Sequence, residues 1–150
     1  MQNNIDIEVK LDPNYTKPKL IIYTNNINDN INKIISKLQN NNDNTLIGYK
    51  DDQGFIIELK KIETIYTENK KVYAKSENET YQLKKRIFEL EEALEEFSFV
   101  RISNSEIVNF KQVKSINFKI VGTIILNFKS GNKTYVSRRY VKKIKDYLNV

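Results

Sequence analysis

The feature that most restricts the fold of this chain is a run of short apolar-rich segments, beginning at residue 46, that are joined by tight polar turns. Turns as short as 51–54 and 68–70 connect antiparallel strands, so the pattern predicts β-hairpins. In the first turn, Gly54 is expected to supply the dihedral angle that other residues resist. The strands predicted in this part of the chain are 46–50, 55–59, 62–67, 71–75 and 80–83.

The same pattern continues after one helical interruption. Ile87, Leu90, Leu94 and Phe97 have helical spacing and predict a helix over about 84–96. The segment 99–110 then forms two strands around a break at Asn104 and Ser105. Further strands are predicted at 113–120, 123–129 and 133–137, with a tight turn at 130–132. A last helix begins near Arg138 or Arg139, has Ser137 as a plausible N-cap, and buries Val141, Ile144 and Leu148.

This order of elements indicates an α+β fold that is mostly antiparallel, because strands and helices do not alternate as a parallel sheet requires. The asparagine-rich run at 40–44 favours a linker and divides the chain into 1–43 and 44–150. The first part predicts strands at 4–11 and 19–24, separated by a turn at 12–14, and an amphipathic helix over 27–38. This small strand–strand–helix unit cannot bury much apolar surface alone, so we expect it to serve dimerisation or regulation.

The composition excludes several classes of site. The 150 residues include no Cys and no His, which removes disulfides, Cys or His metal ligands and histidine acid–base chemistry. Glycine-rich phosphate loops and nucleophile elbows are also missing from the sequence. We therefore expect neither an enzyme nor a bound cofactor or metal. Apolar runs are too short to span a membrane and the N-terminus has no secretory pattern, so we expect a soluble cytoplasmic protein.

The charge is positive and unevenly distributed. The formal net charge is +6, and the segment from Lys129 to the C-terminus is strongly basic. Such a patch suits a polyanion, although a solvated lysine-rich face gives the same pattern. Acidic residues gather at 89–96, while Lys84, Lys85 and Arg86 begin the predicted helix, the reverse of what its dipole favours. Packing either tolerates this arrangement, or the three cations and the first-turn N–H groups bind a phosphate.

Residues 99–110, FVRISNSEIVNF, place a polar tip between two strands. At such a tip Asn104 either forms the turn or contacts a base edge with its amide. This segment, with the following KQVKSI and the later TYVSRRYVKKIK, resembles the LytTR DNA-binding domain of bacterial transcriptional regulators. Upstream, KKIETIYTENKKVYA resembles the early strand pair of that domain and YQLKKRIFELEEAL its internal helix. The resemblance covers about 44–150.

The resemblance implies an elongated arrangement of small sheets and a sequence-specific regulator that inserts loops into successive major grooves of double-stranded DNA. By position, it implies base contacts from Arg139, Asn104 and Lys70, with Lys71 or Asn69 as substitutes for Lys70. Arg139 is placed to donate a bidentate pair to guanine. Contacts to the DNA backbone are implied for Arg101, Ser103, Ser105, Ser137, Arg138, Lys142, Lys143 and Lys71.

Several alternatives remain at this point. Arg101 either contacts phosphate or pairs with the acidic cluster, and Asn109 is expected to be a turn residue. Residues 1–43 are too short for the receiver domain that usually accompanies LytTR, so we expect a stand-alone member that binds repeated half-sites as a homodimer. One rival function is a protein-interaction domain that senses a membrane partner. Another is single-strand or RNA binding through exposed rings such as Tyr73, Tyr81 and Tyr135.

Overall fold

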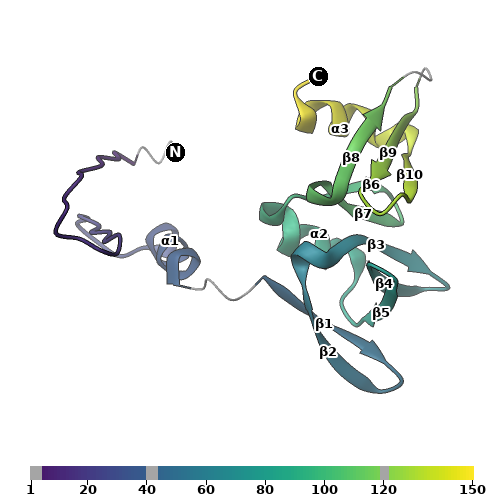
Figure 1. Ribbon diagram of the computed structural model, residues 1–150, viewed down its shortest axis with the longest axis horizontal. Coiled ribbons are helices and arrows are strands. Elements are labelled where there is room, and N and C mark those ends of the chain that lie inside the picture. Colours follow the sequence, from purple (N-terminus) through teal and green to yellow (C-terminus); the bar gives the residue numbers. More distant parts are fainter. Residues whose placement is uncertain (1–4, 40–43, 119–121) are drawn as a thin grey trace. The chain divides into compact units, whose positions relative to one another are not determined.

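The computed structural model describes residues 5–39, 44–118 and 122–150 (Figure 1). Contacts between residues divide the chain into two units, Met1–Asn40 and Asn41–Val150. The division falls within the asparagine-rich run, where polar side chains favour turns over packed structure. The roles expected for the two parts remain predictions.

Among the described residues of the first unit, 5–39, there is one helix, α1, at Asp29–Gln39, which confirms the predicted helix. Asn28 caps it, because its Oδ1 accepts the backbone N–H of Ile31 at 3.0 Å. The helix leaves part of its apolar stripe in solvent, since Leu38 is 48% exposed, and Ile27, which precedes the helix, is 70% exposed.

The two strands predicted in this unit are wrong. Residues 5–24 form no strand, and position 4 of the first predicted strand lies outside the described residues. The turn between them is present, since the N–H of Asn14 donates to Asp12 Oδ1 at 2.9 Å. An alternating segment becomes a strand when a neighbouring edge pairs its backbone and a core takes its apolar face. Here Leu11 stays 96% exposed, so the segment gains neither.

The second unit is built on a seven-stranded antiparallel sheet with the order β2-β1-β5-β4-β3-β7-β6. The strands are β1 Thr45–Lys50, β2 Gln53–Glu58, β3 Ile62–Glu68, β4 Lys71–Ser76, β5 Glu79–Leu83, β6 Phe99–Ser103 and β7 Glu106–Asn109. Every predicted hairpin of this region is present. The sequence pattern did not indicate that β7 would pair with β3, which lies far before it in the chain.

A smaller sheet has the order β10-β9-β8 and is also antiparallel. Its strands are β8 Val113–Asn117, β9 Ile124–Phe128 and β10 Lys133–Val136. The strand predicted over 113–120 ends in residues outside the described part, which stops at 118. The predicted turn at 130–132 is confirmed, because the N–H of Gly131 donates to the Phe128 carbonyl at 3.0 Å.

Two hairpins turn on residues with left-handed backbone angles. Asp51 and Asp52 have φ of 48° and 66°, and Asn69 and Lys70 have 51° and 65°. Positive φ at both central residues is what a two-residue type I′ turn requires. The expectation for Gly54 is therefore wrong, since Gly54 lies in β2 opposite Tyr49 and the two aspartates carry the unusual angles.

Two short helices complete this unit: α2, Ile87–Leu94, and α3, Val141–Leu148. Four single 3-10 turns accompany them: η1 Leu59–Lys61, η2 Glu95–Phe97, η3 Phe110–Gln112 and η4 Arg138–Tyr140. Helix α2 starts later than predicted, after Arg86. The Glu89 carboxylate accepts the Arg86 backbone N–H at 3.2 Å, so a side chain of the helix already occupies the position proposed for a phosphate.

The unit has two hydrophobic cores that meet at β6 and β7. Phe99 and Ile107 belong to the first core, with α2 and the large sheet, whereas Val100, Ile102 and Val108 belong to the second, with the small sheet and α3. Successive side chains of a strand point to opposite faces, so these two strands serve both cores. The result confirms the predicted α+β, mostly antiparallel class.

Candidate nucleic-acid interface

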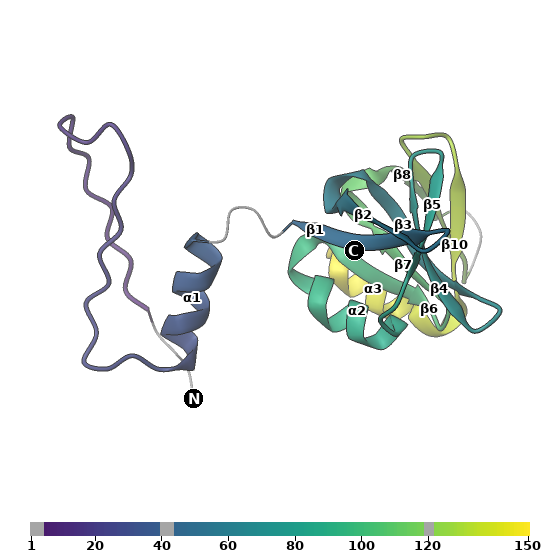
Figure 2. The same ribbon diagram turned by 90° about the horizontal axis from the view of Figure 1, so that it is seen from below.

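Three polar segments lie at one end of β3, β6 and β7: the β3–β4 turn, the β6–β7 turn and η4. The N–H of Thr67 donates to the Ser105 carbonyl at 2.9 Å, which joins the first two segments. The N–H of Ser137 donates to the Ile102 carbonyl, also at 2.9 Å, which joins η4 to β6. The β3–β4 and β6–β7 hairpins point toward the same side of the second unit in both views (Figure 1 and Figure 2). These segments are called the contact face, consisting of Asn69, Lys70, Asn104, Ser105 and Arg138–Tyr140.

The β6–β7 turn is held from within by Arg101. The guanidinium donates from Nε to the Ser103 carbonyl at 3.1 Å and from Nη2 to the Asn104 carbonyl at 2.6 Å. The Ser103 hydroxyl also accepts the N–H of Ser105 at 3.2 Å. These bonds fix the turn backbone while the side chain of Asn104 stays exposed. Among the described residues, Asn104 is not one of those with positive φ, so the backbone does not require an asparagine there.

A tyrosine joins the tip of this turn to η4. The Tyr140 hydroxyl donates to Asn104 Oδ1 at 3.1 Å. The ring of Tyr140 packs against the second core, so its position is set by the scaffold. Arg139, the preceding residue in η4, is exposed. Two of the three residues implied to contact bases, Asn104 and Arg139, are thus linked through Tyr140 although they are far apart in sequence.

The cationic residues that the family resemblance implies for DNA contact differ in whether their side chains have partners within the protein. Within the described residues, no hydrogen bond or ion pair involves the side chains of the first group, which are all exposed. This group comprises Lys70, Lys71, Arg138, Arg139 and Lys142. Arg101 and Lys143 instead share the carboxylate of Glu91, each at 3.0 Å. The structure therefore shows the pairing of Arg101 with the acidic cluster that the sequence left open.

The Glu91 carboxylate lies between α2, β6 and α3. Burial alone would raise its pKa, but hydrogen bonds from Lys143 and Arg101, with their positive charges, outweigh that effect and lower it. The carboxylate therefore stays ionised and holds both cations. The sequence did not single out Glu91 within the acidic cluster, because its neighbours look equivalent until the helix is packed.

A second carboxylate joins the two sheets directly behind the β6–β7 turn. Glu106 accepts hydroxyl bonds from Thr64 of β3 at 3.0 Å and Thr134 of β10 at 2.8 Å. Burial raises the pKa of Glu106, and the charge of the nearby Glu63 adds to this, while the two hydroxyls oppose it. The Glu63 carboxylate in turn accepts from Asn132 Nδ2 at 3.2 Å and from the Ser130 hydroxyl. Three of these hydrogen bonds, from Thr134, Asn132 and Ser130, thus hold the small sheet and its turn against the large sheet.

Three remaining polar residues have scaffold or partial roles. Asn109 is 1% exposed, and its Nδ2 donates to the Ile62 carbonyl at 2.9 Å. It caps η3 by accepting the Lys111 N–H at 3.0 Å, in agreement with the expected turn residue. Ser105 is exposed on the contact face, with its hydroxyl 3.4 Å from that of Ser103. Ser137 occupies the N-cap position of η4 as expected, but its side chain makes no capping hydrogen bond.

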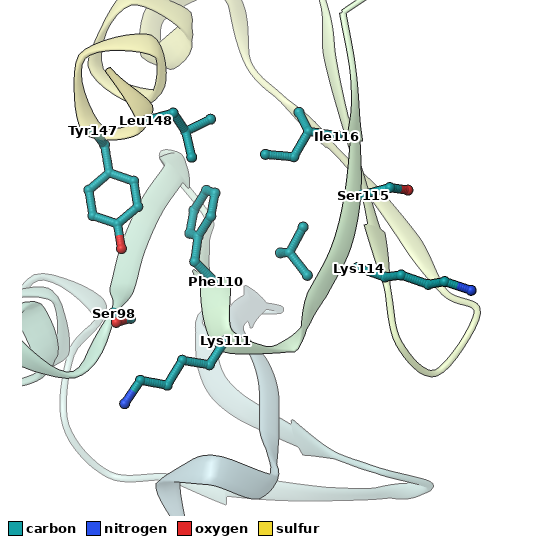
Figure 3. A pocket seen from close by; sticks show the side chains of 9 residues that line it. Ser98, Phe110, Lys111, Lys114, Ser115, Ile116, Tyr147 and Leu148 are labelled. Carbon is teal, nitrogen blue, oxygen red and sulfur yellow. The ribbon is translucent and has the colours of Figure 1, made fainter. Parts of the chain in front are cut away.

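A shallow hollow of about 350 Å³ lies at the opposite ends of β6 and β7 (Figure 3). Phe110, Ile116 and Leu148 face one another across it, whereas Lys111 and Lys114 point away. Ser98 on its wall precedes β6, and Asn104 follows that strand, so the hollow is separate from the contact face. The described residues contain no group of three or more carboxylates placed to bind a metal. Nor does any described helix have the length and hydropathy to cross a membrane.

A rigid antiparallel scaffold that presents exposed cations and an amide on adjoining turns is typical of a nucleic-acid-binding protein. The model of the LytTr DNA-binding domain matches residues 52–149. The solved LytTr DNA-binding domain from Bacillus cereus has a TM-score of 0.68 and 25% identity, and the match covers 71% of this chain and 98% of that one.

Relatives in Staphylococcus aureus match over nearly the whole chain. One from strain NCTC 8325, described as an uncharacterized HTH-type transcriptional regulator, is 36% identical over 141 residues, covering 93% of this chain and 95% of the relative. Another with the same description, from strain MW2, is 34% identical and covers 100% of this chain and 99% of the relative. The match therefore includes the first unit.

The chain belongs to the LytTR family of DNA-binding domains. This confirms the resemblance drawn from the sequence, and with it the prediction of a DNA-binding transcriptional regulator. The family is one of DNA-binding domains rather than of enzymes. In the described part of this chain, strands separate each α-helix from the next, so the fold is that of the LytTr domain and not a helix-turn-helix.

Proposed function

We propose that this DNA-binding protein recognises specific sequences in double-stranded DNA by inserting its contact face into successive major grooves. Arg139 and Asn104 contact bases from adjoining segments, and Lys70 contacts a base from the β3–β4 turn. The observation that carries the proposal is the exposure of Asn104 and Arg139 on two segments that are hydrogen-bonded to each other, at a turn where positive φ does not explain the choice of asparagine. A guanidinium suits the two acceptors of guanine, and a side-chain amide suits a base edge.

The backbone contacts divide into two groups. Arg138, Lys142 and Lys71 are exposed and carry the phosphate contacts that set affinity and salt dependence, and Ser137 and Ser105 lie beside them. Ser103 and Arg101 are engaged in holding the β6–β7 turn. Their bonds, and the pairing of Lys143 with Glu91, favour a positioning role for these residues over direct contact with phosphate.

The test is a binding titration on duplex DNA from upstream of the protein's own gene and on random duplex, at several salt concentrations. Arg139→Ala should cost about 1–3 kcal/mol on the specific duplex and relax one base position. Lys142→Ala, its matched control on the next helix, should weaken all sequences alike and reduce the salt slope by about 0.9. Equal affinity of the native protein for both duplexes would overturn the proposal.

The first unit supports a homodimer on repeated half-sites. Its apolar side chains are exposed: Ile7 is 84% and Val9 79% exposed, besides Leu11 and Ile27 described above. Such surface is costly in water and is buried when two copies associate. Sedimentation of the full chain with its DNA should give two copies per pair of half-sites. One copy at high protein concentration would contradict the homodimer.

Cytoplasmic action follows from this role, because the DNA that such a regulator binds lies in the bacterial cytoplasm. Neither rival function gains support. Tyr73 stacks on Tyr66 with ring centroids 5.7 Å apart, and Tyr81 lies 5.5 Å from Phe55, so these rings are engaged with neighbours and not displayed in a row for single-stranded bases. Nothing in the family points to a membrane partner.

A further inference from the structure

The side-chain amide of Asn104 has an acceptor and a donor group, and the acceptor already has a hydrogen-bond partner within the protein. A side-chain amide has an oxygen that accepts and an NH₂ group that donates. The Asn104 oxygen accepts the Tyr140 hydroxyl at 3.1 Å, and none of the hydrogen bonds among the described residues involves its Nδ2. A phenol hydroxyl can donate or accept, and here it donates to the amide oxygen, so in this structure the NH₂ group is the end left for a ligand.

The orientation has a consequence for base preference. In the major groove guanine, adenine and thymine each present an acceptor, whereas cytosine presents a donor, its amino group. An NH₂ group directed at the groove can donate to guanine, adenine or thymine. Opposite cytosine it faces an amino group, which is another donor. A buried donor without an acceptor is unfavourable, so cytosine is discriminated against.

The same tyrosine controls the spacing between the two base-contacting residues. Tyr140 ends η4 and its ring packs on the second core. Ser137, at the start of η4, is bonded to β6 through its N–H. The backbone of Arg139 therefore lies between two links to the β6–β7 hairpin, which hold it near Asn104 before DNA arrives. Such preorganisation reduces the ordering cost of binding.

We infer that Tyr140 is a positioning residue that determines which bases Asn104 accepts, by holding its amide with the NH₂ group toward the groove. The inference rests on the proposed base contact of Asn104 and goes beyond it, because it gives Tyr140 a role that is exerted through Asn104. A sequence search for basic and amide side chains would pass over this residue, since its hydroxyl acts on Asn104 and not on the ligand.

The experiment is selection of binding sites from a randomised duplex pool with the full chain, followed by competition between single-base variants of the selected site. Asn104→Ala should relax one position. Tyr140→Phe should weaken discrimination against cytosine roughly two- to tenfold at that same position, because the freed amide can turn its oxygen toward the cytosine amino group. Tyr147→Phe is the matched control: it loses a hydroxyl on α3, where the ring lies 5.0 Å from Phe110, and should behave as the native protein.

A second measurement needs no DNA. In the free protein, nuclear relaxation of the Asn104 side-chain NH₂ should show a rigid group that becomes mobile in Tyr140→Phe and is unchanged in Tyr147→Phe. The inference is overturned if Tyr140→Phe keeps the native preference at the position that Asn104→Ala relaxes, or if Asn104→Ala relaxes none. In the latter case, relaxation of another position by Arg139→Ala would leave the proposed DNA recognition standing. A native protein that selects no sequence would refute that recognition itself.

Discussion

Lys70 occupies a position where stability and DNA binding should respond in opposite directions. Its φ of 65° places it in the left-handed region, which disfavours a residue with a β-carbon by about 1–2 kcal/mol. Replacing it with glycine removes that strain but adds about 0.4–1 kcal/mol of conformational freedom to the unfolded chain. The difference lies between about 0 and 1.6 kcal/mol, with a central value of about 0.8 kcal/mol. We therefore expect Lys70→Gly to raise the free energy of unfolding in a urea titration of the full chain.

The same substitution removes a cation from the contact face. If Lys70 contacts a base, affinity for the specific duplex should fall by about 1–3 kcal/mol and one base position should relax. If it contacts a phosphate, the salt slope should fall by about 0.9 for every sequence. Lys70→Ala separates the two effects: it removes the cation but keeps a β-carbon in the strained conformation, so it should weaken binding without the gain in stability.

Asp52→Gly provides the matched control in the β1–β2 turn, where φ is 66° but the side chain is acidic. Aspartate adopts this conformation more readily than lysine, so the gain in stability should be smaller, and DNA binding should not weaken. The reasoning is refuted if Lys70→Gly is less stable than the native protein. It is also refuted if the variant binds DNA with unchanged affinity, base preference and salt slope.

Two further predictions concern the carboxylates behind the contact face. The pKa of Glu106 is raised in the folded state, so this group stabilises the fold when the pH is below its ordinary pKa. That stabilisation is lost as the pH rises through the folded-state pKa. In denaturant titrations between about pH 4 and pH 7, Glu106→Gln should therefore lose less stability than the native protein. The pKa of Glu91 is lowered in the folded state, so this group stabilises the fold when the pH is above its ordinary pKa. That stabilisation is lost as the pH falls through the folded-state pKa. Near neutral pH, Glu91→Gln should lower the free energy of unfolding by up to about 1 kcal/mol. Because it releases Lys143 and Arg101, it should also bind random duplex more tightly, with a steeper salt dependence. An unchanged salt slope would argue against that release.

Local features account for what was predicted correctly. The hairpins of the second unit follow from alternation and from short polar turns, which involve residues within a few positions of one another. The error at Gly54 is also local: a two-residue turn at Asp51 and Asp52 replaced the four-residue connection expected, and this moved glycine into a strand. The failed strands of the first unit have the right alternation but lack an edge to pair with and a core to cover, which their own residues do not reveal.

By itself, the sequence determined the antiparallel class, the positions of the turns and the family, because periodicity, turn chemistry and motif order are properties of the linear chain. It also placed Asn104 and Lys70 on turns and Arg139 at the start of the last helix, whereas in the structure Arg139 lies in η4 and the helix begins at Val141. The tertiary structure alone decided which side chains are held by others: Tyr140 reaches Asn104 across 36 positions in the chain, and Glu91 takes Lys143 across 52. Such partners are chosen when β6, α2 and α3 pack together, since only packing brings distant residues within hydrogen-bonding distance.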